Sequence, residues 1–168
     1  GGVVNIITRE GHYHDNFYAG GSTSGSYQTV NNMRSGNLAV DLADKKWYVR
    51  LSGTSRDASN TQTPEGELLN SQFTDSNISL KLGVKPVKNH ELTLNYQRFA
   101  AQDAGIPGGS AFPVTATASY TDIQKNMLSA AYTINLSDAS LKRVRFRYFH
   151  QYILRDVELK PSAVVTLT

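Results

Sequence analysis

The sequence predicts an all-β chain, and more specifically an antiparallel segment of a transmembrane β-barrel. Three observations lead to this fold class. Apolar and polar residues alternate with a period of two, the expected strands are about twice the usual five to six residues, and short connections alternate with long ones. A soluble sandwich also alternates apolar and polar residues, so a soluble all-β binding module stays open as the alternative.

The alternation marks the expected strands one by one. It is clearest after residue 46, where Trp47, Val49 and Leu51 fall on one side of an extended chain and the residues between them on the other. A weaker, Gly-rich strand is expected at about 17–24. The remaining strands are marked by Leu38, Val40 and Leu42; Ile78, Leu80, Leu82 and Val84; Leu92, Leu94 and Tyr96; Leu128, Ala130, Tyr132 and Ile134; and Val144, Phe146 and Tyr148. We therefore expect seven strands of about 9 to 14 residues.

The connections favour the barrel over the sandwich. Short links rich in Pro, Asn, Asp, Lys and Ser are expected at 43–46, 86–90 and 136–140, and long links at 57–72 and 102–119. Outer-membrane barrels have short periplasmic turns and long external loops. Aromatic residues near the expected strand ends fit the interfacial girdles of such barrels: Phe17, Tyr18, Trp47, Tyr48, Phe99, Tyr120 and Tyr152.

Composition excludes several other classes of function. The chain has no cysteine, so a disulfide framework, a thiolate zinc site and a cysteine nucleophile are excluded. Its 17 basic and 14 acidic residues are scattered, and nucleic acid is not an expected partner. Nothing positions two carboxylates for acid–base chemistry, and the glycine pairs lack the ending of a phosphate loop. We expect no enzyme activity and no cofactor.

One histidine cluster has the spacing of a candidate metal site. His12 and His14 would share a face of an extended chain, and Asp15 follows them. We interpret the segment as a polar linker and predict no metal.

Several short motifs resemble one family of membrane proteins. The opening segment 1–9 looks like the last plug strand of a TonB-dependent outer-membrane receptor, just before its chain enters the barrel. Residues 25–29 resemble the first outer hairpin of these receptors, 48–57 their third barrel strand, and 105–109 part of an external loop. The expected plug–barrel junction comprises Gly1, Gly2, Val3, Asn5, Ile7 and Thr8.

The resemblance implies an architecture larger than this chain. Such receptors hold a plug inside a barrel of about 22 strands. The last plug strand and its linker would then occupy 1–9, and barrel strands one to seven 10–168. The TonB box, most of the plug and the remaining strands would lie elsewhere. Strand one would rise from the periplasm, so the short links become periplasmic turns, and strand seven would end near Asp156, with 158–168 opening a fourth outer loop.

The resemblance also implies a function. The chain would belong to a receptor in the bacterial outer membrane that binds a scarce ligand, with a ferric siderophore or similar metal chelate expected, and imports it with energy from TonB. Outer-membrane lipid, TonB and the small-molecule ligand are the expected partners. A passive barrel of porin or adhesin type is the second alternative, beside the soluble module.

Parity assigns the candidate site residues to the lumenal wall. Its basic members are Arg50, Arg56, Lys81, Lys85, Arg143, Arg145 and Arg147, with Asp41 the main acid. A guanidinium offers a fixed fork of donors to anions. We expect Arg50, Lys81, Arg143, Arg145 and Arg147 to face the plug. Arg56, nearest the outer mouth, is the expected ligand contact, with Ile106, Phe112 and Tyr120 around the long loop. The alternative is that the basic residues pair with acidic residues of the plug or simply keep the wall hydrated.

Overall fold

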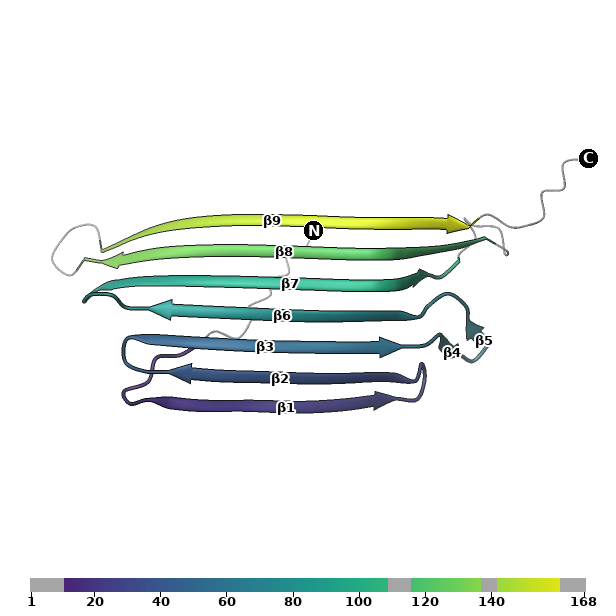
Figure 1. Ribbon diagram of the computed structural model, residues 1–168, viewed down its shortest axis with the longest axis horizontal. Helices are drawn as coiled ribbons and strands as arrows, with labels where there is room; N and C mark the ends of the chain where they lie inside the picture. Colours follow the sequence, from purple (N-terminus) through teal and green to yellow (C-terminus); the bar gives the residue numbers. More distant parts are fainter. Residues whose placement is uncertain (1–10, 109–115, 137–141, 161–168) are drawn as a thin grey trace, which may run out of the picture.

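The computed structural model consists of one large antiparallel sheet and one small hairpin (Figure 1). It describes residues 11–108, 116–136 and 142–160. The large sheet contains β1 (Tyr18–Gln28), β2 (Met33–Ala43), β3 (Trp47–Ala58), β6 (Phe73–Val84), β7 (His90–Ile106), β8 (Thr117–Asn135) and β9 (Arg143–Lys160). The all-β prediction with seven long strands is confirmed.

The topology of the large sheet is a simple meander. Its strands follow one another in the order β1-β2-β3-β6-β7-β8-β9, and every neighbouring pair is antiparallel. β4 (Thr61–Thr63) and β5 (Gly66–Leu68) form a separate hairpin in the connection between β3 and β6. β1 and β9 are the two edges, so the sheet formed by the described residues is open rather than closed into a barrel.

The strands extend further than the alternation predicted, at the end of the sheet where long loops were expected. β7, β8 and β9 contain 17, 19 and 18 residues. Residues 102–106 and 117–119, expected in a loop, instead belong to the β7–β8 ladder, in which Ile106 pairs with Ala118. β9 continues to Lys160 rather than ending near Asp156. The ends of these strands contain mainly polar and small residues, so the alternation of apolar and polar residues does not mark them. They still pair, because the backbone hydrogen bonds of a ladder do not require apolar side chains.

The first hairpin also lies later than expected. Residues 25–28 continue β1, and the turn occupies residues 29–32, with Gln28 paired to Met33. Asn32 has φ 50°, a left-handed conformation that asparagine adopts more readily than most residues. The Tyr27 hydroxyl donates a hydrogen bond of 2.8 Å to Oδ1 of Asn32, which supports the turn.

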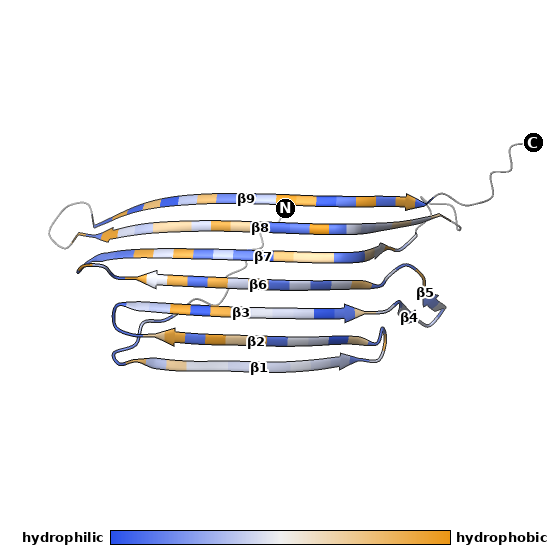
Figure 2. Ribbon diagram, viewed as in Figure 1, coloured by the Kyte–Doolittle hydropathy of each residue, from blue (hydrophilic) through white to orange (hydrophobic). Residues whose placement is uncertain are grey.

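The register divides the side chains between two chemically different faces. On one face, a single row crosses six strands through Leu42, Val49, Leu82, Leu94, Ala130 and Tyr148. The next row, on the opposite face, contains Asp41, Arg50, Lys81, Asn95 and Ser129. Figure 2 shows the resulting alternation of hydrophobic and hydrophilic positions along the strands. We call these the apolar face and the polar face.

The apolar face is not covered by a second layer within the described residues. Leu51 is 46% exposed, Ile78 48% and Phe146 63%. The buried hydrophobic residues are few and mostly small, namely Met33, Ala43, Tyr48, Ala58, Ala101 and Ala118. A soluble sandwich buries such a face against another sheet, at a spacing of about 10 Å. Within the described residues no other element covers this face.

Aromatic residues form a row at the short-turn end of the apolar face. Trp47, Tyr132 and Phe146 share one row of the register, and Phe17 lies 6.4 Å from Trp47 between ring centroids. The expected girdle was therefore partly wrong. Tyr18, Tyr48 and Phe99 lie on the polar face, because residues adjacent in a strand point to opposite sides.

Tyr48 covers a glycine on the neighbouring strand. Tyr48 is 8% exposed and is paired in the ladder with Gly83. A Cβ atom added at Gly83 would lie 2.1 Å from a carbon of the Tyr48 ring, so the ring rests directly on the glycine backbone. At Gly36, by contrast, an added Cβ would have no neighbour within 4 Å.

This contrast predicts different outcomes for the same substitution. Gly83→Ala displaces the Tyr48 ring, and we expect it to lower the free energy of unfolding by about 1–3 kcal/mol, as overpacking does. Gly36→Ala, the matched control, should be neutral or slightly stabilising because it only restricts the unfolded chain. Urea midpoints of the folded protein measure both effects, and equal midpoints for the two variants would refute the packing of Tyr48 on Gly83.

Candidate functional site

The basic residues that were expected on the lumenal wall all lie on the polar face. Arg50 and Arg56 come from β3, Lys81 from β6, and Arg143, Arg145 and Arg147 from β9. Arg50 is paired directly with Lys81, and Arg145 with Thr133 of β8. The period of two places them together because each strand contributes every second residue to the same face.

Arg50 is neutralised within the sheet. Its Nη1 atom lies 2.6 and 2.5 Å from the two carboxylate oxygens of Asp41, its partner on β2. The Arg50 side chain is 14% exposed and that of Asp41 28%. Asp41 is the acid that the sequence pattern placed on this face.

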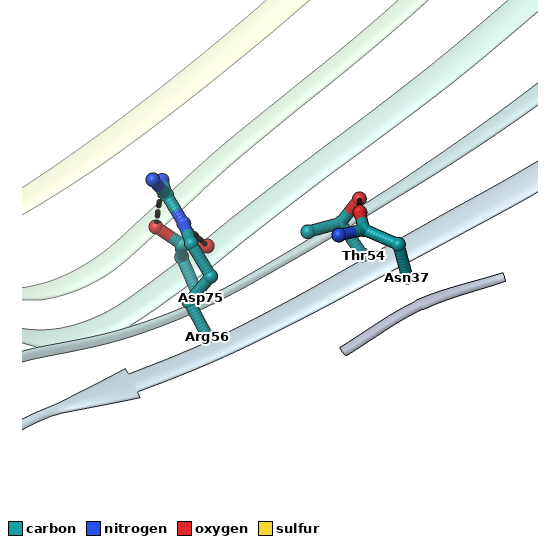
Figure 3. Close-up of polar contacts among 4 residues, drawn as sticks. All are labelled: Asn37, Thr54, Arg56 and Asp75. Carbon is teal, nitrogen blue, oxygen red and sulfur yellow. Dashed lines mark hydrogen bonds and ion pairs between the residues drawn. The ribbon is translucent and has the colours of Figure 1, made fainter. Parts of the chain in front are cut away.

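Arg56 has a carboxylate partner that sequence reasoning missed. Its Nε donates to Oδ1 of Asp75 at 2.9 Å and its Nη2 to Oδ2 at 2.5 Å, a two-point contact drawn in Figure 3. The Asp75 side chain is 8% exposed, and the guanidinium also lies 5.4 Å from the centroid of the Phe73 ring. Extending the alternation of β6 back from Asn77 by two residues would have placed Asp75 beside Arg56.

Neutral hydrogen bonds continue the polar face beyond these ion pairs. Thr54 Oγ1 donates to Oδ1 of Asn37 at 2.5 Å between β3 and β2 (Figure 3). Ser26 and Ser35 join their hydroxyls at 2.7 Å between β1 and β2. Arg50 and Arg56 are thus built into a lateral network whose acids, Asp41 and Asp75, belong to the sheet itself rather than to a plug.

The three arginines of β9 differ from those of β3. Arg143 Nε donates to Asn135 Oδ1 at 3.1 Å and Arg145 Nε to Thr133 Oγ1 at 3.0 Å, so both acceptors are neutral. All three side chains are exposed, and among the described residues none of them forms an ion pair. Successive guanidinium groups on this face are about 7 Å apart along the strand. They form an uncompensated positive stripe at one edge of the polar face.

The segment before β1 lies against the polar face, at its short-turn end. The Tyr13 ring meets Tyr48 edge-on at 5.0 Å between centroids, and the Lys85 ammonium lies 3.7 Å from the Tyr13 centroid. Burial raises the pKa of the Tyr13 phenol above its usual range. A Cβ atom at Gly11 would clash with the Tyr48 ring, so the chain passes close to the sheet there.

A hollow separates this segment from the sheet. Its volume is about 360 Å³, and its lining includes Gly11, His12, His14, Tyr18, Asp41 and Arg50. The His14 ring stacks on Tyr18 at 4.2 Å, and the His14 amide donates to the Asp44 carbonyl at 3.3 Å. Within the described ranges, no group of three or more potential ligands is arranged to hold a metal ion.

At the opposite end of the sheet, Asn70 ties the β3–β6 connection to the β7–β8 hairpin. Its Nδ2 donates to the carbonyls of Ile106 and Ala118, at 2.7 and 2.5 Å. The Gly105 amide donates to the Gln72 carbonyl at 2.9 Å. A Cβ atom at Gly105 would lie 2.3 Å from the Asn70 carbonyl oxygen, so glycine permits this close approach. The two long connections are therefore held together at their bases.

The predicted ligand contacts do not form one cluster. Arg56 is level with Asp75 and Ala101 in the ladder, and Ile106 lies five residues beyond Ala101, about 17 Å further along β7. Tyr120 is paired with Ala104, next to an irregularity where the β8–β9 register shifts by one residue. Phe112 lies outside the described residues, as do Gly1, Gly2, Val3, Asn5, Ile7 and Thr8 of the expected junction.

Comparisons with known proteins return nothing for this chain. No family model, no curated protein and no solved structure matches it. In the part of the chain that the structure describes, no helix has the length and apolar character needed to cross a bilayer.

The buried carboxylate of Asp75 gives a test of the Arg56 contact. Asp75→Asn keeps the shape and removes the charge, and we expect the free energy of unfolding to fall by about 1–2 kcal/mol, the lower part of the range for charged hydrogen bonds. The value is low because the Arg56 side chain is 44% exposed and water partly replaces the lost partner.

Asp57→Asn is the matched control for this substitution. Asp57 is exposed, lies one residue from Arg56, and accepts a hydrogen bond from Thr74 that an amide oxygen can also accept. We expect its urea midpoint to stay near that of the wild type. Equal losses in the two variants would show that Asp75 acts only through overall charge.

Proposed function

We propose that this chain is part of a TonB-dependent receptor of the bacterial outer membrane. The receptor binds a scarce ligand outside the cell, such as a ferric siderophore or a similar metal chelate, and imports it with energy supplied by TonB. The observation that carries the proposal is the uncovered apolar face of a long-stranded antiparallel meander whose opposite face is charged and hydrogen-bonded.

The dimensions of the apolar face support contact with lipid. Apolar residues dominate four successive rows of the register, from the row of Ile134 and Val144 to that of Val40, Leu51 and Leu80. The next row is mixed, with Leu38, Ile78 and Tyr152 beside Thr23, Arg98 and Asn126. Rows on one face are about 7 Å apart, so the four apolar rows cover roughly 20 Å along the strands, and the belt with the mixed row included covers roughly 27 Å. A strand tilt of about 40° reduces its height to about 20 Å, close to the 25 Å or so of the apolar band in outer-membrane barrels.

The open edges support membership of a larger barrel. Within the described residues β1 and β9 each have an unpaired edge, and in lipid every unsatisfied backbone group costs several kcal/mol. Closure is the arrangement that removes such edges. We propose that β1 and β9 pair with further strands of a barrel of about 22, in which these are strands one to seven.

The segment before β1 favours a plugged receptor over a passive porin. It packs on the polar face through Tyr13, which contacts Tyr48 and Lys85, and so approaches the barrel from the lumenal side. A chain that leaves a plug would enter the first strand in this way. The resemblance of 1–9 to a last plug strand agrees with this path, and TonB itself would contact a part of the plug outside this chain.

The charged residues suggest how the lumen is used. The uncompensated stripe of Arg143, Arg145 and Arg147 fits an acidic surface of the plug, whereas Arg50 and Lys81 would line the wall beside it. Arg56 keeps a partly exposed guanidinium near the loop end, which suits an anionic chelate; Ile106, Phe112 and Tyr120 would contribute from the long loop.

Genetic deletion combined with iron uptake tests this proposal. In the source bacterium, the parent gene and the TonB gene are deleted separately, and uptake of radioactive iron is measured with hydroxamate, catecholate and carboxylate siderophores. We expect uptake of at least one chelate to be lost in both deletions and to return when the parent gene is restored.

Other outcomes separate the alternatives. Uptake that depends on the parent gene but persists without TonB would indicate a passive barrel. Recovery of the folded protein without detergent would indicate a soluble binding module. Either result would contradict the proposal.

A further inference from the structure

The short-turn end of the sheet is strongly basic. Lys45, Lys46 and Lys88 lie in the β2–β3 and β6–β7 turns with exposed side chains, and Lys142 and Arg143 add two exposed charges at the start of β9. The described acids at this end are fewer: Asp15 is exposed, and two others are partly buried. Asp44 Oδ1 accepts a hydrogen bond of 2.6 Å from the Lys45 amide, and Glu91 is partly buried beside Tyr13. The turn end therefore presents a net positive surface.

The opposite end of the sheet has the reverse character. Exposed acids gather near the long connections and the far strand ends: Asp57, Glu65, Glu67, Asp103, Asp156 and Glu158. Fewer basic residues accompany them, among them Arg155 and Lys160. Basic residues therefore gather at the turn end of the strands and acidic residues at the opposite end.

Apolar groups accompany the turn lysines. Val87, at the β6–β7 turn, is 60% exposed, and Phe17, beside Trp47, is 65% exposed. A hollow of about 590 Å³ opens between the two turns, and its lining includes Lys45, Lys46, Val87 and Lys88. Lys85 also lines it, but its ammonium is engaged by the Tyr13 ring. The aromatic row of the apolar face begins immediately beside this hollow.

We propose that the turn surface formed by Lys45, Lys46, Val87 and Lys88 binds the anionic phosphate headgroups of the phospholipid leaflet on the turn side. Lysines next to an aromatic row, with apolar groups at the same level, match the chemistry of a membrane interface. Flexible ammonium groups suit mobile lipid phosphates, whereas a fixed anion site would use a guanidinium fork. This inference rests on the proposed membrane location and adds a lipid preference to it.

Energy transfer from Trp47 tests the preference directly, because Trp47 is the single tryptophan of this chain and lies beside the turn surface. The full-length protein is reconstituted in phosphatidylcholine vesicles that contain dansyl-labelled phosphatidylglycerol or dansyl-labelled phosphatidylethanolamine. The difference between wild type and Trp47→Phe isolates the signal of Trp47. We expect several-fold more transfer to the anionic lipid at low salt, and a loss of this preference as salt rises.

Two triple variants decide whether the turn lysines are responsible. Lys45→Gln, Lys46→Gln and Lys88→Gln together should abolish the several-fold preference, since each lysine near an anionic surface contributes roughly a fivefold factor in affinity. Lys125→Gln, Arg155→Gln and Lys160→Gln remove the same charge from other parts of the sheet and should leave the preference unchanged. Heat-modifiable migration verifies that each variant is folded.

The possible failures are distinguishable. Equal transfer to both labelled lipids, or an unchanged preference in the turn variant, overturns the lipid site while the membrane location stands. Complete loss of the preference for the anionic lipid on addition of soluble polyglutamate would assign the surface to an acidic protein and also overturn the lipid site. The absence of transfer to either lipid would contradict the membrane location itself.

Discussion

The period-two register of the seven-stranded ladder is the constraint on which the rest of the structure depends. Val49 and Leu82 face one way because Arg50 and Lys81 face the other, and a slip of one residue between β3 and β6 would exchange them. The ion pair of Arg56 with Asp75 forms only in the observed register, as does the packing of Tyr48 on Gly83. Lateral contacts on the polar face therefore fix the register that creates the apolar face.

This division of faces links the fold to the proposed function. A single sheet with few buried side chains has little core of its own, so its stability depends on what covers each face. Lipid would cover the apolar face, with its row of Trp47, Tyr132 and Phe146 at one boundary. The segment that carries Tyr13 packs on the polar face. The arginine stripe on β9 has no acidic partner among the described residues, and an acidic surface would complement it. In the proposed receptor, lipid would cover the apolar face and a plug would cover the polar face.

The sequence predicted the parts of the fold that alternation governs. The seven strands, their two faces and the alternation of short turns with long connections follow from the positions of residues such as Leu51 and Leu80. The ends of β7, β8 and β9 escaped prediction because residues such as Gln102 and Gly105 enter a ladder through their backbone alone. Within the site, Asp75 was missed for the same reason, and the approach of Tyr13 to Tyr48 is a contact distant in sequence that no local pattern encodes.

A labelling scan along β6 tests the central claim most directly. The chain contains no cysteine, so single cysteines at 76–84 can carry nitroxide labels without a background from this segment. Accessibility to lipid-soluble oxygen and to a water-soluble nickel chelate is then measured in reconstituted membranes. The account predicts two opposed period-two patterns, with oxygen favoured at Ile78, Leu80 and Leu82 and nickel at Asn77, Ser79 and Lys81. Equal access of nickel to both sets would contradict it.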